Sequence, residues 1–530
     1  MDTMTAPNRQ PDGPPSPVAT SEPTERLSFV RLGAALAVLA LLVAGVWIGL
    51  RRVGDDPVTL DTSWSVPYVD VTLTPSYQFQ NPSSNPARDI ALAFVVAGSS
   101  DPCQPSWGGA YSLDAAGRDL DLDRRILQLR ASGGDVMVSF GGQANDELAG
   151  VCTAADDLLS AYRSVVERYD LHAIDLDIEG DDLTDAAAGA RRATAISVLQ
   201  RERVDAGERL DVWVTLPVAR NGLTDDGRAA VGALLDAGVE LAGVNAMTMN
   251  FGTADAPTSD MLAATTAALE ATMNQVTSIF ANHGVTLEGS ARWARIGATP
   301  MIGQNDVVGE VFTLADAQGL ADFALRTGLG RVSFWSLNRD TSCDQAFADV
   351  MVLSATCSSV SQDSLDFAEV FTELPGRSAA LPQVDAVTEP NQGQVTDDPA
   401  TSPYPIWRPD AYYPGGYKVV RAGKVYEAKW YNQGDDPAMP HDNPWDTAWA
   451  LVGPVSPNDA PFTPATLPAG THPAWDPVTL YDTGEKVLFE GLPYEARWPN
   501  KGEAPATLFP VNPDSAWEPL FTIAGEPETP

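Results

Sequence analysis

The stretch "HAIDLDIEG", residues 172–180, alternates three acidic residues with three apolar ones. On a β-strand, side chains alternate between the two faces, so Asp175, Asp177 and Glu179 would share one face, about 7 Å apart along it. Like charges at that spacing repel, and in a poorly solvated place at least one of these carboxyl groups should keep its proton at neutral pH. A protonated carboxyl can act as a general acid. The stretch therefore predicts both a strand and a reactive centre.

Seven further apolar runs lie on either side of this stretch, separated by alanine-rich segments with helical character. The runs cover residues 66–71, 90–97, 135–142, 210–218, 243–252, 296–303 and 331–338, and helices are predicted over 146–168, 188–204, 259–284 and 314–327. Eight strands alternating with helices over about 300 residues predict an α/β fold, a (β/α)8 TIM barrel, with a doubly wound open sheet as the structural alternative. A barrel carries its active site at the C-terminal ends of its strands, which is where the three acids fall.

Charge and composition exclude several classes of function. The chain has 530 residues, enough for one large domain and smaller modules, and a formal net charge of −38. Such a surface repels nucleic acid, so a neutral substrate fits better. The 4 histidines and 4 cysteines have no metal-type spacing, and we predict no metal and no cofactor. We expect two disulfides, Cys103 with Cys152 and Cys343 with Cys357, although spacing alone does not fix the connectivity.

The N-terminal region indicates the compartment. Residues 1–28 are rich in Pro, Ser and Thr and predict a disordered cytoplasmic tail, followed by a transmembrane anchor over 29–50 and a linker over 51–63. The 19 uncharged residues 32–50 are long enough to cross a bilayer as one helix. A cleaved signal peptide, which would leave a secreted protein, is the alternative. Because disulfides form in oxidising compartments, we expect a single-pass membrane protein with its C-terminal part outside the cell.

The C-terminal part contains a repeat. "KVVRAGKVYEAKW" (418–430) and "KVLFEGLPYEARW" (486–498) match at an offset of 68 residues. An offset that is kept at many aromatic positions predicts two copies of one small all-β module. We place the modules at 404–453 and 473–522, with Pro-rich linkers over 376–403 and 454–472.

Residues 64–375 resemble the glycoside hydrolase family 18 chitinases of bacterial type. The family's SxGG and DxxDxDxE motifs are matched by Ser139, Gly141, Gly142, Asp175, Asp177 and Glu179, with His172 in place of the first aspartate. "TPMIGQND" (299–306) and "SFWSLNRD" (333–340) are also similar to a branch of this family. The resemblance implies a hydrolase that cleaves β-1,4 links between N-acetylglucosamine units.

The family's mechanism is retaining and substrate-assisted, an exception to the scheme with two carboxylates. Carried over to this chain, Glu179 is the general acid and then the base, and Asp177 orients the acetamido group. Asp175 tunes Asp177, and Trp335 forms the floor under the sugar. We expect crowding to keep Glu179 protonated while Asp177 stays free to hold the acetamido group.

One position departs from the family pattern. Where many members have MxYD, this chain has "MTMN", Met247 to Asn250, so Met249 replaces the tyrosine that contacts the acetamido oxygen. We include Met247 and Asn250 among the substrate-binding candidates, together with Ser139, Gly141, Gly142 and Trp335. A hydrogen-bonded amide in the barrel interior is the alternative interpretation of Asn250.

The two C-terminal modules resemble chitin-binding modules of carbohydrate-binding family 5/12, in which aromatic rings stack on sugar rings. Trp430, Tyr431 and Trp498 are the candidates for this contact. Pro499 stands in the second copy where the first has Tyr431, which predicts weaker binding. Trp449 and Trp517 are predicted to form the core of each module.

The function predicted from the sequence is that of a monomeric, membrane-anchored extracellular chitinase whose partner is chitin or another N-acetylglucosamine polysaccharide. Two alternatives remain open. One is a catalytically silent lectin or adhesin for chitin. The other is an endo-β-N-acetylglucosaminidase that acts on N-glycans.

Overall fold

The computed structural model of the chain describes residues 64–81, 85–253, 256–343, 353–372, 374, 397–441, 444–456, 459–461, 466–505, 515–521 and 525–526. The chain divides into two compact units, residues 1–59 and 60–530, and only residues of the second are described. The predicted tail, membrane anchor and first linker lie outside the described residues, as does most of the predicted linker 376–403. Among the residues that are described, no helix has the length and apolar character to span a bilayer.

Each of the eight predicted apolar runs overlaps a strand of one sheet. The strands are β2 (Tyr68–Asp70), β3 (Asp89–Ala97), β6 (Asp135–Gly141), β7 (Ala173–Asp177), β8 (Asp211–Ala219), β10 (Leu241–Met247), β11 (Ile296–Thr299) and β14 (Arg331–Val332). They pair in parallel in the order β2–β3–β6–β7–β8–β10–β11–β14. Strand β1 (Trp64–Ser65), just before β2, pairs in parallel with β14, so the segment 64–70 has a partner at both ends of this order.

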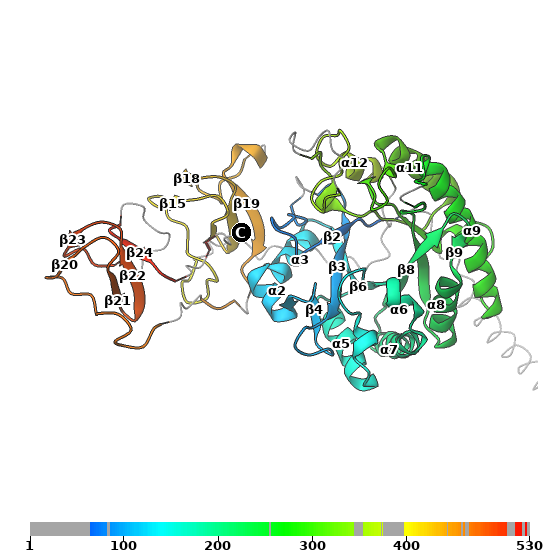
Figure 1. Cartoon of the computed structure of the whole chain (residues 1–530), viewed down its shortest axis with the longest axis horizontal. Helices are drawn as coiled ribbons and strands as arrows, with labels where there is room; N and C mark the ends of the chain where they lie inside the picture. The colour runs from blue at the N-terminus through cyan, green and yellow to red at the C-terminus, as the bar shows by residue number, and fades with distance from the viewer. Residues whose placement is uncertain are drawn as a thin grey trace, which may run out of the picture. The chain divides into compact units, whose positions relative to one another are not determined.

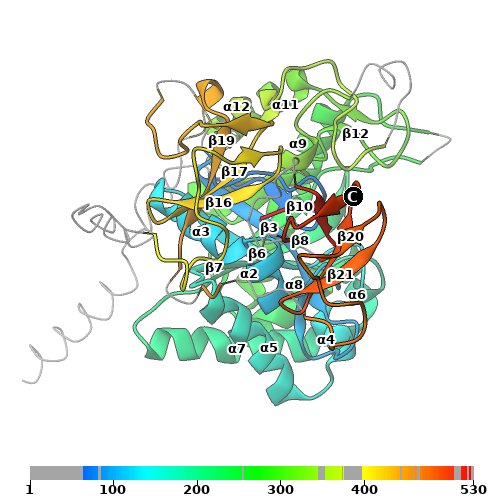
Figure 2. The same cartoon turned by 90° about the vertical axis from the view of Figure 1, so that its left-hand side faces the viewer.

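Helices follow most of these strands. They are α2 (Leu113–Asp119), α3 (Leu122–Ala131), α4 (Leu148–Val151), α5 (Ala155–Arg168), α6 (Gly180–Thr184), α7 (Ala186–Asp205), α8 (Asp225–Asp236), α9 (Met261–Asn282), α10 (Ser290–Trp293), α11 (Leu314–Thr327), η1 (Leu337–Arg339) and α12 (Asp366–Thr372). The strands lie inside, with α5 and α7 on one side and α9, α11 and α12 on the other (Figures 1 and 2). Short antiparallel strands are added at β4 (Pro105–Trp107), β5 (Tyr111–Ser112), β9 (Gly222–Leu223), β12 (Gly303–Gln304) and β13 (Val311–Phe312).

One predicted helix is wrong as a single element. The segment 146–168 contains the short α4 and the longer α5, separated by Cys152 and Ala154 in extended backbone. Cys152 forms a disulfide with Cys103, and its backbone leaves the helical region there. The second expected disulfide, Cys343–Cys357, is also present, and both pairings are therefore confirmed.

The sheet of this α/β domain is buried on both faces, which explains the continuous apolar runs. Residues on one face pack against the helices in a large hydrophobic cluster, while alternate residues form a small separate one. The small cluster contains Trp64, Val66, Tyr68, Ala91, Ala93, Met137, Ala173 and Trp213. Because strand side chains alternate, this second face also carries the polar residues of β6, β7 and β8 described below.

The C-terminal part contains two small units with matching strands. The first has β15 (Tyr412–Tyr413), β16 (Lys418–Arg421), β17 (Lys424–Ala428), β18 (Asn432–Gln433), η3 (Pro444–Asp446) and β19 (Trp449–Pro454). The second has β20 (Leu480–Tyr481), β21 (Lys486–Phe489), β22 (Leu492–Ala496), β23 (Asn500–Lys501) and β24 (Trp517–Pro519). In each unit the first and fourth strands pair, and the other three form an antiparallel sheet. Each strand of the second unit begins 68 residues after its counterpart in the first.

Candidate active site

The centre of the site is Asp175, a fully buried carboxylate in β7. Its Oδ2 accepts hydrogen bonds from the Tyr68 and Ser139 hydroxyls, each at 2.8 Å. Its Oδ1 accepts from the Thr215 hydroxyl and from Arg331 Nη1, each at 2.7 Å. The donors come from four other strands, β2, β6, β8 and β14. A buried carboxylate is tolerated only with such charged and hydrogen-bonding partners, so this network fixes Asp175 in place.

Arg331 is the cation of this network and is itself fully buried. Its Nε donates to the Ser333 hydroxyl at 2.7 Å, and its Nη2 donates to the Tyr68 hydroxyl at 3.0 Å. The guanidinium also lies over the rings of Tyr68 and Trp213, 5.4 and 5.6 Å from their centroids. The charge on Arg331 therefore offsets that of Asp175 in a place that water does not reach.

Asp177 ends β7, two residues after Asp175, and its side chain is only 5% exposed. In the sheet it lies opposite Gly141 of β6 and Thr215 of β8. Its Oδ1 has no hydrogen-bond partner among the described residues. Burial, followed by the charges of Glu179 and Asp175, raises the pKa of Asp177 well above its usual value. The site therefore offers one buried acceptor oxygen that no group in the described part of the chain uses.

The alternation predicted that Glu179 lies on the strand, and this is wrong. Strand β7 ends at Asp177, and Glu179 occupies the N-cap position of α6, where the chain turns at Gly180 with a φ of 57°. Its side chain is half-buried. Burial, and after it the negative charge of Asp306, raises the pKa of Glu179 to about 7. Glu179 is thus protonated in a large fraction of molecules at neutral pH.

The pKa of Glu179 is raised as expected, but burial and Asp306, rather than the crowding of the three acids, are the causes. The pKa values of both carboxyl groups are raised, and burial is the largest cause for each. For Glu179 the second cause is Asp306, a residue more than a hundred positions away in sequence, rather than its neighbours on β7. Burial therefore favours the protonated form of both acids.

The paired glycines at the end of β6 let the backbone of this strand lie close to β7 and to an aromatic ring beside the acid pair. Gly141 and Gly142 have φ values of 102° and 86°, in the region that favours glycine. A Cβ on Gly141 would lie 2.1 Å from the Asp177 carbonyl oxygen, and one on Gly142 would lie 2.9 Å from the Phe94 ring. Both positions need glycine because the backbone of β7 and an aromatic ring occupy the space.

Trp335 lies just after β14 and belongs to an aromatic wall. Its ring stacks on Phe94, with centroids 5.3 Å apart and planes inclined by 18°. Tyr68, whose hydroxyl binds Asp175, lies 6.1 Å from Trp335 between ring centroids. The half-buried Trp335 thus adds an apolar ring face next to the Asp175 network, a surface suited to a sugar ring.

Asn250 is exposed and is not the interior amide that one interpretation allowed. Its Nδ2 donates to Asp306 Oδ2 at 2.7 Å, and its backbone N–H donates to Asn305 Oδ1 at 3.3 Å. Met247, the other candidate on this segment, ends β10 and is 8% exposed. Asn250 therefore joins the loop after β10 to the loop that carries Asp306.

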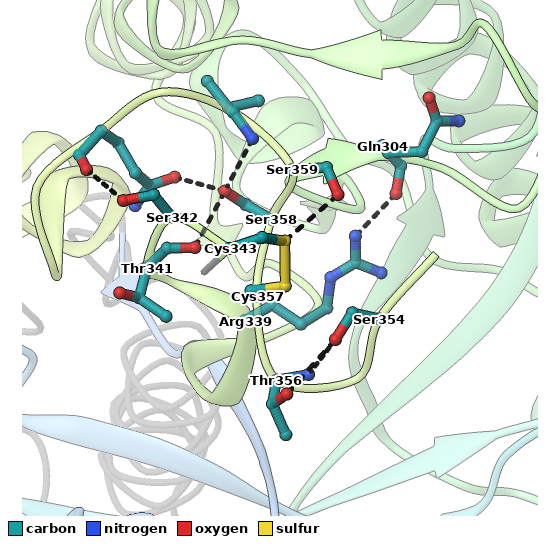
Figure 3. The surroundings of a disulfide bond; sticks show 12 residues. Gln304, Arg339, Thr341, Ser342, Cys343, Ser354, Thr356, Cys357, Ser358 and Ser359 are labelled. Carbon is teal, nitrogen blue, oxygen red and sulfur yellow. Dashed lines mark hydrogen bonds between the residues drawn. A yellow bond between two sulfur atoms is a disulfide. The ribbon is translucent and has the colours of Figure 1, made fainter. Parts of the chain in front are cut away.

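A disulfide supports the loop of Asp306 from outside. Figure 3 shows the Cys343–Cys357 bridge with Ser358 and Arg339 close by. The Ser358 carbonyl accepts from the backbone N–H of Gln304 at 2.9 Å, and Arg339 Nη2 donates to the Gln304 carbonyl at 2.6 Å. These contacts hold the start of the loop two residues before Asp306.

The sequence analysis missed four residues of the network. They are Tyr68, Thr215, Asn245 and Arg331. Asn245 of β10 is fully buried and donates from Nδ2 to the hydroxyls of Thr215 and Thr299, at 2.9 and 2.6 Å. For Tyr68, Thr215 and Asn245 the signal was a polar residue inside an apolar run, on the same strand face as the acids. Among the described residues, no group of three or more His, Cys, Asp or Glu side chains is placed to hold a metal ion.

The aromatic candidates of the C-terminal modules are accessible. Trp430, Tyr431 and Trp498 are 44%, 61% and 38% exposed. Trp449 and Trp517 are buried in the two module cores, which confirms the prediction for them. The first module has further rings that the sequence analysis did not single out. Trp445 is 72% exposed, and Tyr412 stacks on Tyr431 with centroids 5.9 Å apart.

No protein-family model matches the chain. Two curated proteins are similar to part of it. The probable bifunctional chitinase/lysozyme of Escherichia coli (strain K12) is 36% identical over 303 residues, which are 56% of this chain and 33% of the relative. Endochitinase 11 of Metarhizium anisopliae is 34% identical over 302 residues, 56% of each chain. The chain therefore spans a third to about half of the length of these relatives.

A solved structure is also similar. The catalytic domain of a hyperthermophilic chitinase from Pyrococcus furiosus matches with a TM-score of 0.51 and 26% identity, over 59% of this chain and 94% of that domain. The relatives and this structure together support a glycoside hydrolase.

Proposed function

We propose that this chain is a chitinase of glycoside hydrolase family 18 that hydrolyses β-1,4-linked N-acetylglucosamine polymers with retention of configuration. The observation that carries the proposal is the acid pair Asp177 and Glu179, with raised pKa values, at the end of β7. The partial similarity to chitinases supports the same class of substrate. We further propose that the eight parallel strands form a (β/α)8 barrel, because β1 pairs with β14 and β2 with β3.

In the proposed first step, the protonated Glu179 gives its proton to the glycosidic oxygen. The acetamido carbonyl oxygen of the sugar attacks the anomeric carbon, and the electron pair of the breaking C–O bond goes to the leaving oxygen. A cyclic oxazolinium ion forms. A pKa of about 7 suits this role, because a general acid works best when its pKa is near the working pH.

In the second step, the Glu179 carboxylate takes a proton from water while the water oxygen attacks the anomeric carbon from the face that the leaving group left. The C–O bond of the oxazolinium ring breaks, and the acetamido group is restored. Asp177 orients this group throughout. Its unused Oδ1 is suited to accept the acetamido N–H, since a buried acceptor without a partner gains from any donor that enters.

Asp175 acts through Asp177 and does not touch the substrate in this proposal. The charge of Asp175, held by Arg331 and three hydroxyl groups, helps to raise the pKa of Asp177. Trp335, beside Phe94 and Tyr68, provides the floor for the sugar. Ser139, Gly141 and Gly142 position the acids, and Met247 at the end of β10 and Asn250 in the loop after it help to bind the sugar.

The two C-terminal modules are proposed to bind chitin through Trp430, Tyr431 and Trp498, which are exposed in the way that stacking on a sugar ring requires. We also propose that the chain is a monomer and that a helix within residues 29–50 anchors it, with its C-terminal part outside the cell, or that this part is secreted after cleavage.

The experiment is to incubate the full chain with chitin oligomers and to follow the length and anomeric form of the products. Retained β-anomers are expected as the first products. Inverted anomers would contradict the mechanism. Binding without any product would indicate a lectin or adhesin, and cleavage of N-glycans in preference to chitin oligomers would indicate an endo-β-N-acetylglucosaminidase.

A further inference from the structure

Helix α3 begins at a buried aspartate whose side chain does not cap it. Asp121 is 1% exposed and has a φ of 51°, in the left-handed region that residues other than glycine seldom adopt. An aspartate at an N-cap normally accepts a hydrogen bond from the second or third amide of its own helix. Asp121 makes no such bond. A strained backbone and an unused cap indicate that this carboxylate serves another contact.

The contact is with the first C-terminal module. The Tyr404 hydroxyl donates to both oxygens of Asp121, at 2.9 and 2.8 Å, and Lys418 Nζ donates to Oδ2 at 2.6 Å. From α3 itself, Arg124 Nε donates to Oδ1 at 2.7 Å. Burial alone raises the pKa of Asp121, but the charges of Lys418 and Arg124 outweigh it, and the pKa is lowered. Tyr404 and Lys418, nearly 300 residues away in sequence, thus bind the Asp121 carboxylate.

Arg124 makes a second set of contacts at the end of this module and in the segment that follows it. Its Nη1 donates to the Pro454 carbonyl at 2.8 Å, and Nη1 and Nη2 each donate to one oxygen of Asp459 at 3.0 Å. The backbones also approach closely, because a Cβ on Gly453 would lie 2.4 Å from the Arg124 carbonyl oxygen. A paired contact between a guanidinium and a carboxylate is specific in geometry as well as strong.

The second module lacks the residues for this contact. At the offset of 68, His472 replaces Tyr404 and Phe521 replaces Gly453. Lys486, the counterpart of Lys418, pairs instead with Glu495 of its own module at 3.5 Å. Since even a Cβ does not fit at Gly453, a phenylalanine ring at that place excludes the same docking.

We propose that the first module is docked on α3 as a fixed part of the α/β domain, locked by Asp121, Arg124 and Lys418. Trp430 and Trp445 stay 44% and 72% exposed in the docked arrangement, so the lock does not cover these rings. If the proposed function holds, the docked module presents a polysaccharide to the acid pair in one geometry. A module joined only by a flexible linker over 376–403 would present the polysaccharide in many geometries. The docking itself does not depend on that function.

The test is a short pulse of an amine-acetylating reagent on the full chain, read by peptide mass spectrometry. Lys418 and Lys486 are matched residues, 22% and 46% exposed. In the native chain Lys418 should react about tenfold more slowly, because it reacts only when the lock opens. Gly453→Phe puts a ring against the Arg124 carbonyl oxygen and blocks the docking. Because the φ of 155° at Gly453 is unfavourable for a side chain, Asp121→Asn, which lies outside the module and leaves its sequence intact, is the second variant. Lys418 should then react as fast as Lys486.

Two results would overturn the docking. One is equal reaction of Lys418 and Lys486 in the native chain. The other is a slow Lys418 that neither Gly453→Phe nor Asp121→Asn accelerates. A second measurement compares cleavage of soluble oligomers with cleavage of insoluble chitin, and only the latter should fall in Gly453→Phe. If no variant cleaves either substrate but the labelling is as expected, the proposed function fails and the docking stands.

Discussion

Asp306→Asn should move the alkaline limb of the pH–rate profile to lower pH. The pKa of Glu179 is raised to about 7, first by burial and second by the charge of Asp306. A general acid must carry its proton, so activity falls as the pH rises through this pKa. Removing the negative charge lowers the pKa of Glu179. Because burial is the larger cause, Asp306 accounts for less than half of the rise, and the limb should move by at most about one pH unit.

The substitution keeps the local geometry, because the new amide oxygen can still accept from Asn250 Nδ2, as the carboxylate does at 2.7 Å. The assay is the initial rate of release of a chromophore from an aryl chito-oligosaccharide over a range of pH. Asp181→Asn, an exposed change on α6, is the matched control and should leave the limb in place. An unmoved limb in Asp306→Asn, or one that moves to higher pH, would refute the electrostatic explanation of the Glu179 pKa.

Two further predictions concern stability and binding. Arg331→Met should lower the free energy of unfolding by about 3–5 kcal/mol, because it leaves the Asp175 charge buried without its cation. Urea denaturation measures this change, with the exposed Arg326→Met as the control. A loss below about 1 kcal/mol would contradict the account. Trp430→Ala should reduce retention on chitin beads more than Trp498→Ala, because the first module exposes more rings. The double variant should abolish retention while soluble oligomers are still cleaved, and unchanged retention would exclude these rings as the binding face.

Where local chemistry decides an element, the sequence predicted it closely. Helix α11 covers the predicted residues 314–327, since Thr313 forms a capping box with Asp316 and Gly328 ends the helix in a left-handed conformation. The strands were found because burial on both faces leaves continuous apolar runs. Glu179 was placed on the strand because alternation in sequence continues beyond the turn at Gly180.

Contacts between distant segments could not be predicted. Arg331 is 156 residues from Asp175, and no local pattern distinguishes it from a surface arginine before an apolar run. Asp121 resembles an ordinary N-cap ahead of a helix, and only the fold shows that it receives Tyr404 and Lys418 instead. The carboxylates of the site were recognisable from spacing, whereas the partners that set their protonation were not.

The most direct test of the central claim is the activity of Glu179→Gln on chitin oligomers beside that of the native chain. The amide keeps the size of the side chain but cannot deliver a proton, so we predict an unchanged unfolding midpoint, retained binding to chitin beads and the loss of oligomer hydrolysis by at least about a hundredfold. Asp181→Asn, two residues further on, should hydrolyse normally. Hydrolysis by Glu179→Gln at the native rate would contradict the assignment of Glu179 as the acid.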